Sequence, residues 1–155
     1  MTELAEGAQA PDFDMPVDGG GSVSLKELRG KSVVLYFYPK DDTSGCTKEA
    51  ISFSGLKDDF EAANSKVIGV SPDSIKSHEK FKTKHDLTVM LASDEEKKTV
   101  QDYGVWVEKS MYGRKYMGVE RATFLIGPDG SIAKVWRKVK VAGHAEKVLE
   151  EVKAL

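Results

Sequence analysis

The strongest constraint on the fold is a continuous apolar run at residues 32–38, which reads Ser-Val-Val-Leu-Tyr-Phe-Tyr. Its β-branched and aromatic side chains favour a strand, and a strand without polar alternation is typical of one buried on both faces. Pro39 follows directly and ends the strand, because proline offers no backbone N–H to a sheet. The rest of the chain must therefore cover both faces of a sheet built around this run.

Further strand-like and helix-like segments alternate along the chain. The predicted strands lie at residues 66–71, 88–92, 122–126 and 132–136, the last two joined by a Gly-Pro-Asp-Gly turn. The predicted helices lie at residues 24–30, 44–64, 74–84, 95–103 and 143–155. A glycine run at 19–21 predicts an N-terminal β-hairpin. This order indicates an α/β fold, with a mixed central sheet flanked by helices, in a single domain over residues 1–155.

Charge and hydropathy exclude several classes of protein. The 23 basic and 25 acidic residues are dispersed and give a net charge of −2, so we expect no nucleic-acid partner, which would need a concentrated basic face. No apolar run of roughly 18 residues occurs, so we expect no membrane span. The first ten residues carry no basic segment of a signal peptide. We therefore expect the protein in the reducing cytoplasm, where a lone thiol stays reduced.

Cys46 is the only cysteine, which excludes an internal disulfide and a metal site built on several cysteines. A lone cysteine is most often an inert buried side chain. Cys46, however, begins the predicted helix at 44–64, where free backbone N–H groups and the helix dipole favour an anion such as a thiolate. It also lies beyond the C-terminal end of the apolar strand, where open α/β sheets carry their sites. These features indicate a reactive thiol without selecting its reaction.

Two alternatives stay open on the residues alone. A cysteine hydrolase would need a histidine beside the thiol, and the candidates are His78, His85 and His144. We expect each of these histidines to be a solvated surface residue. A non-catalytic binding module would leave Cys46 with ordinary reactivity.

Residues 39–46 read Pro-Lys-Asp-Asp-Thr-Ser-Gly-Cys and match the Pro-x-x-x-Thr-x-x-Cys motif of the peroxiredoxins. The flanking Tyr-Phe-Tyr-Pro and Cys-Thr-Lys-Glu resemble the bacterioferritin comigratory protein, or Q-type, branch. Ala-Pro-Asp-Phe at 10–13 and Arg-Ala-Thr-Phe at 121–124 extend the resemblance over almost the whole chain. It implies a thioredoxin-like fold and an antioxidant thiol peroxidase that needs no metal or other cofactor.

The resemblance also implies roles at the motif. Cys46 is implied to be the peroxidatic cysteine, which attacks hydrogen peroxide or an organic hydroperoxide and becomes a sulfenic acid. Thr43 is implied to hydrogen-bond the thiolate and the peroxide, although capping the helix is a plainer role for the same hydroxyl. Pro39 is implied to shield the thiolate, and the backbone N–H of Gly45 to complete the peroxide-binding cradle.

Two charged residues complete the implied site. Arg121 matches the arginine that faces the thiolate from another strand and favours its charged form; without the motif it would be interpreted as a surface charge. Glu49 is implied to orient this arginine, and its plainer interpretation is a first-turn acid stabilised by the helix dipole.

The sequence departs from the Q-type pattern at the second cysteine. Many members carry one five residues after the first, where this chain has Ile51, or in a Phe-Cys-x-Lys stretch, where residues 81–84 read Phe-Lys-Thr-Lys. The resemblance then implies a single-cysteine mechanism resolved by an external thiol. The donor is open between thioredoxin, glutathione with glutaredoxin, and a second copy of the chain. A monomer is expected by resemblance, and a peroxide sensor would share the first chemical step.

Overall fold

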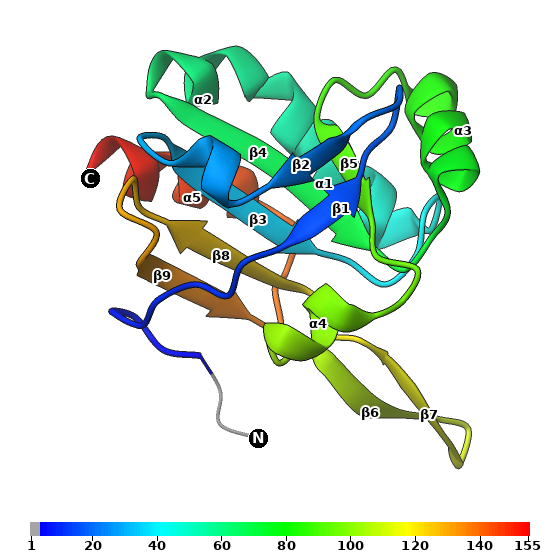
Figure 1. The fold of residues 1–155 in the computed structure, drawn as a ribbon. Helices are drawn as coiled ribbons and strands as arrows, with labels where there is room; N and C mark the ends of the chain where they lie inside the picture. Colours follow the sequence, from blue (N-terminus) through cyan, green and yellow to red (C-terminus); the bar gives the residue numbers. More distant parts are fainter. Residues whose placement is uncertain (1–3) are drawn as a thin grey trace.

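A mixed five-stranded sheet forms the centre of the computed structural model, which describes residues 4–155 (Figure 1). In spatial order its strands are β5 (Met90–Ser93), β4 (Ser65–Ser71), β3 (Ser32–Phe37), β8 (Ala122–Ile126) and β9 (Ile132–Arg137). β3 pairs in parallel with β4 and antiparallel with β8. Every residue of β3 is buried, so the apolar run is the central strand, and the expected α/β class with a mixed sheet is confirmed.

Alternate side chains of β3 enter two separate cores. Leu35 and Phe37 lie in a core covered by the N-terminal segment and α4 (Lys98–Asp102). Val34 and Tyr36 lie in the other core, which is covered by α1 (Ser44–Gly55), α2 (Lys57–Ala62), α3 (Ile75–His85) and α5 (His144–Lys153). Among residues 4–155, no helix is long and apolar enough to cross a bilayer.

Two small hairpins accompany the sheet. The first, β1 (Asp14–Pro16) and β2 (Ser22–Ser24), confirms the predicted N-terminal hairpin. The second, β6 (Trp106–Met111) and β7 (Arg114–Val119), projects from the body of the molecule (Figure 1) and was not predicted. Most of its residues are exposed or half-buried, so no alternation of apolar and polar residues marks it in the sequence.

Three predicted helices differ from those observed. The region 44–64 divides into α1 and α2 at Leu56, whose φ of −106° and ψ of 7° interrupt the helix. The region 24–30 holds only the single turn η1 (Lys26–Leu28), because Ser24 still belongs to β2. The region 95–103 is helical only in α4, because Lys97 has a φ of 62° and the helix begins after it.

Candidate active site

The loop after β3 and the first turn of α1 present the cysteine. Thr43 occupies the N-cap position of α1, and the backbone N–H of Thr47 donates to the carbonyl of Thr43 at 2.8 Å. The N–H groups of Ser44, Gly45 and Cys46 precede this bond and so have no acceptor within the helix. The side chain of Cys46 is only 1% exposed. Its sulfur therefore lies beneath the surface, at the positive end of the helix.

Arg121, the residue directly before β8, reaches this thiol from a distant part of the chain. Its Nη2 donates to Sγ of Cys46 at 3.2 Å, and its Nη1 donates to Oε1 of Glu49 at 2.7 Å. The arginine side chain is 17% exposed and the glutamate side chain 1%. The fold thus brings together three of the residues that the motif resemblance singled out.

Gly45 makes room for the guanidinium. A Cβ at this position would lie 3.1 Å from Nη2 of Arg121, which is closer than ordinary van der Waals contact. The glycine therefore allows the arginine to lie against the first turn of α1. It is half-buried, as is Pro39 at the other end of the loop.

Glu49 is an under-bonded buried acid. Its Oε2 has no hydrogen-bond partner among residues 4–155, and a buried unpaired oxygen costs free energy. Burial raises the pKa of Glu49 to about 7, although the charge and hydrogen bond of Arg121 oppose that rise. The protonation state of Glu49 therefore changes near neutral pH, and with it the net charge beside Cys46.

The hydroxyl of Thr43 does not form the helix-capping hydrogen bond that we expected from its plainer role. The hydroxyl donates to the carbonyl of Lys40 at 2.9 Å and makes no capping hydrogen bond. The capping role is therefore wrong for this side chain, which closes the loop instead. Because its single proton is used on Lys40, the hydroxyl offers only acceptor lone pairs to other groups.

The expected surface position of the histidines is wrong for two of the three. His78 is 0% exposed and His144 is 5% exposed. His144 contacts Oγ1 of Thr123 through Nε2 at 2.8 Å, and burial lowers its pKa to about 4. His85 is half-buried and pairs with Asp42 at 2.7 Å.

All three histidines lie within residues 4–155, and each has its hydrogen-bond partners elsewhere than at Cys46. A cysteine hydrolase requires a histidine within hydrogen-bond reach of the thiol. The arrangement of the described residues therefore argues against that alternative.

Two further groups near the thiol carried no signal in the sequence. Burial raises the pKa of Tyr36 well above its ordinary value, and the charges of Glu49 and Cys46 add to the rise. Burial lowers the pKa of Lys109 in β6, and the charge of Arg121 lowers it further. Tyr36 comes from β3, just before the motif loop, and Lys109 from β6, far along the chain; only the fold shows that the charges of the site act on both.

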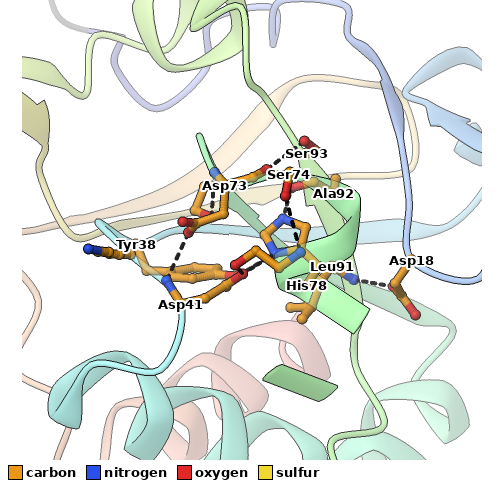
Figure 2. Close-up of polar contacts among 12 residues, drawn as sticks. Asp18, Tyr38, Asp41, Asp73, Ser74, His78, Leu91, Ala92 and Ser93 are labelled. Carbon is orange, nitrogen blue, oxygen red and sulfur yellow. Dashed lines mark hydrogen bonds and ion pairs between the residues drawn. The ribbon is translucent and has the colours of Figure 1, made fainter. Parts of the chain in front are cut away.

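Beneath the motif loop, Asp41 and His78 form a buried pair (Figure 2). Oδ2 of Asp41 lies 2.7 Å from Nδ1 of His78, and the other ring nitrogen lies 2.9 Å from the carbonyl oxygen of Ala92. The hydroxyl of Tyr38 donates to Oδ1 of Asp41 at 2.6 Å. The loop is thereby tied to α3 and β5 on the side away from solvent.

The same cluster contains side chains of the kind that bind metal ions. Asp41, Asp73 and His78 offer ligand atoms within 4.8 Å of one another. Those atoms already bond one another and their neighbours, because Nδ1 of His78 contacts Asp41 and Oδ2 of Asp73 accepts from the N–H of Asp41 and the hydroxyl of Ser71. We therefore interpret the cluster as a hydrogen-bonded network and not as a metal centre.

Comparison with known proteins points to one family. Residues 7–135 match the model of the AhpC/TSA family. A Coxiella burnetii protein named as a peroxiredoxin Bcp is 49% identical over 143 residues, which cover 92% of this chain and 95% of that protein.

Two solved structures resemble the fold closely. A cysteine-to-serine variant of Xylella fastidiosa PrxQ has a TM-score of 0.93 at 39% identity, covering 99% of this chain and 98% of that one. The Xanthomonas campestris bacterioferritin comigratory protein, described by its alkyl peroxide reduction activity, has a TM-score of 0.90 at 41% identity, covering 97% and 98%.

Proposed function

Because the chain belongs to the AhpC/TSA family and, within it, to the Bcp peroxiredoxins, which are thiol peroxidases, we propose that Cys46 is the residue that reduces the peroxide. The observation that carries this proposal is the 3.2 Å contact from Arg121 to the sulfur of Cys46 at the start of α1. A fixed cation and free N–H groups at one sulfur favour the thiolate, which is the nucleophilic form.

In the proposed first step, the thiolate of Cys46 attacks one peroxide oxygen. The new S–O bond forms as the O–O bond breaks, so the sulfur becomes a sulfenic acid and water or an alcohol leaves after taking up a proton. Arg121 and the N–H groups of Gly45 and Cys46 stabilise the charge that moves onto the oxygens. The oxygen of Thr43 accepts a hydrogen bond from the peroxide O–H, which suits its use of its own proton on Lys40.

Two further residues support this step. Pro39 covers the loop side of the thiol and limits its contact with water. Glu49 holds the guanidinium of Arg121 in place through the 2.7 Å bond to Nη1, and so acts through the arginine.

The second half of the proposed cycle uses an external thiol, because the chain has no second cysteine. The sulfenic acid condenses with that thiol, releasing water and forming a mixed disulfide, and another thiol then displaces Cys46. Ile51, at one of the positions where relatives by resemblance carry the second cysteine, is 49% exposed and offers no sulfur. Thioredoxin, glutathione with glutaredoxin, and Cys46 of a second copy are the candidate donors.

The proposed substrates are hydrogen peroxide and organic hydroperoxides. The Xanthomonas campestris relative is described by alkyl peroxide reduction, and this supports the inclusion of organic hydroperoxides. We propose a monomer as the working form, which light scattering on the reduced protein would check.

The test is stopped-flow tryptophan fluorescence after mixing reduced protein with hydrogen peroxide, followed by intact mass. Trp106 and Trp136 supply the signal, and we expect a fast change with a gain of one oxygen at Cys46 that thiol reverses. Cys46→Ser should keep the fold and lose the reaction, because a serine hydroxyl has no accessible anion at neutral pH. Equal reactivity in that variant would refute the assignment.

Other outcomes select among related functions. A reaction as slow as that of a free thiol would favour a non-catalytic module. A fast oxidation that no thiol donor turns over would favour a peroxide sensor. Excess peroxide without thiol should convert the sulfenic acid to sulfinic acid, since the chain holds no resolving cysteine.

A further inference from the structure

Two neighbouring acids of the motif loop are tied to α3 in different ways. Asp42 pairs with Lys84 and His85, and its side chain is 41% exposed. Asp41 pairs with His78, and these side chains are 4% and 0% exposed. We call the Asp41–His78 pair the inner tie and the pairs of Asp42 with Lys84 and His85 the outer tie. The inner tie is buried, so solvent does not weaken it.

The geometry of the inner tie requires an extra proton. Nε2 of His78 lies 2.9 Å from the carbonyl of Ala92, which can only accept, so this nitrogen carries a hydrogen. Nδ1 lies 2.7 Å from Oδ2 of Asp41. With a neutral ring and an ionised carboxylate, two lone pairs would face each other at this distance. The observed contact therefore holds one further proton between the two groups.

The surroundings place that proton on the imidazole. Hydroxyl groups of Tyr38 and Ser77 donate to the two oxygens of Asp41 at 2.6 and 2.8 Å, which stabilises a carboxylate. Burial lowers the pKa of His78, but the hydrogen bond and charge of Asp41, together with the hydrogen bond to the carbonyl of Ala92 and the charge of Asp73, raise the pKa above its ordinary value. Asp73 adds a second anion that acts in the same direction.

We propose that His78 is a positioning residue whose buried imidazolium holds Asp41, and through it the loop 39–43, which leads into the first turn of α1, where Cys46 contacts Arg121. This inference rests on the proposed function of Cys46. The path is short, because Asp41 lies between Pro39 and Thr43 and its backbone N–H is also fixed by Asp73 at 2.8 Å (Figure 2).

Loss of the proton should release the loop at alkaline pH. The groups that face His78 are Asp41 from the loop, Asp73 from the β4–α3 connection, Tyr38 at the end of β3 and the carbonyl of Ala92 in β5. Burial and the charge of Tyr36 raise the pKa of Tyr38 well above its ordinary value, so it stays neutral there. His78 is then the group whose titration breaks the tie.

The first measurement is made on the wild-type protein. NMR spectra that correlate the ring nitrogens with their ring protons report the charge of His78 between about pH 5 and about pH 10. We expect both nitrogens to be protonated at neutral pH. The rate constant of Cys46 with hydrogen peroxide should fall on the order of ten- to a hundredfold as His78 loses its proton, because small misplacements of reacting groups cost that much.

Two matched variants separate the inner tie from the outer one. In Asp41→Asn the amide can donate to Nδ1 of a neutral His78, so the contact no longer needs the extra proton, and the alkaline fall should disappear. Asp42→Asn makes the same chemical change one residue on, at an exposed pair, and should keep the wild-type pH profile.

A neutral His78 ring at neutral pH would overturn the proposal, as would an alkaline fall that persists in Asp41→Asn. If the protein does not react with peroxide at any pH, the proposed function fails on its own. In that case the inner tie, Asp41–His78, is tested by measuring hydrogen-exchange protection of the backbone amides of residues 41–46. Protection should drop as His78 deprotonates, and unchanged protection would refute the proposal.

Discussion

Two buried carboxylates precede and follow Cys46 in the chain, and each faces a cation, yet their hydrogen bonding differs. Asp41 is bonded through both oxygens, to Tyr38, Ser77 and His78. Glu49 bonds Arg121 through one oxygen, and its other oxygen has no partner among residues 4–155. The fully bonded pair lies in the scaffold beneath the loop, and the under-bonded pair lies at the sulfur. Of these two carboxylates, the one with an unpaired buried oxygen is therefore the one beside the thiol, where the proposed reaction would use a charge.

The two pairs also differ in which partner changes its protonation state with pH: the acid in Glu49–Arg121, and the histidine in Asp41–His78. Arginine does not lose its proton in proteins, so Glu49 titrates, and its folded pKa is raised from 4.5 to about 7. The stabilisation linked to protonated Glu49 is complete below pH 4.5 and lost as the pH rises to about 7. The pKa of His78 is raised above 6.5, so its contribution is complete below that value and lost at higher pH.

The largest effect should come from breaking the scaffold pair. Asp41→Ala leaves a buried imidazolium without its anion, and we expect the free energy of unfolding at about pH 6 to fall by about 3–5 kcal/mol in urea titrations. Asp42→Ala, at the exposed pair on the same loop, should leave the unfolding midpoint unchanged. Equal losses in both variants would show that burial does not distinguish the two ties.

Breaking the pair at the sulfur should act on chemistry. Arg121→Ala removes the donor 3.2 Å from Sγ of Cys46, and we expect the rate constant with peroxide to fall about 10²–10³-fold, the usual loss for a preorganised donor. The measurement is stopped-flow fluorescence, with Arg114→Ala on the exposed strand β7 as the control. A loss below threefold would contradict the role given to Arg121.

Replacing Glu49, the acid with an unpaired oxygen, by glutamine should remove a pH dependence of the free energy of unfolding. Between about pH 4.5 and about pH 7, the free energy of unfolding of the wild type should fall on the order of 3 kcal/mol more than that of Glu49→Gln, which has no charge to bury. Urea titrations at several pH values check this. Glu146→Gln, an exposed acid of α5, should behave as wild type, and parallel curves for Glu49→Gln and wild type would refute the shift.

The smallest effect on the rate constant with peroxide should come from adding a methyl group beside Arg121. In Gly45→Ala the new Cβ would lie 3.1 Å from Nη2 of Arg121, so the guanidinium must move by a few tenths of an ångström. We expect the rate constant with peroxide to fall about fivefold, roughly 1 kcal/mol. Gly55→Ala in the same helix has nothing within 4 Å of its added Cβ and should react like wild type.

The sequence allowed the sheet to be predicted, and the motif resemblance pointed to the contacts of Arg121 with Cys46 and Glu49. The strands at 32–38 and 122–126 were identifiable because their side chains are buried in continuous runs. The strand at 132–136 is mostly half-buried and was identifiable because a Gly-Pro-Asp-Gly turn joins it to the strand before it. The break at Leu56 was missed because Phe53 of α1 and Phe60 of α2 pack into the same core. The helical spacing of apolar residues therefore continues across Leu56 without interruption. The hairpin β6–β7 was missed because it has almost no buried face.

The histidines show a different limit. His78 lies in a helix with charged neighbours, and its partner Asp41 is 37 residues earlier in the chain. Nothing in a single sequence links two such positions, since the contact arises only when α3 packs beneath the loop. Arg121 is 75 residues from Cys46, and only the motif resemblance brought these two together before the fold was known.

The strand order fixes when the site can first exist during synthesis. β3 receives its second neighbour only when β8, which begins at Ala122, has left the ribosome. Until then its apolar edge stays open, and an open edge invites pairing with other chains. Arg121 directly precedes β8, so the strand that closes this edge also delivers the cation to Cys46. A nascent chain thus carries a thiol without its cation until β8 pairs with β3, and that same pairing covers the open edge of the central strand.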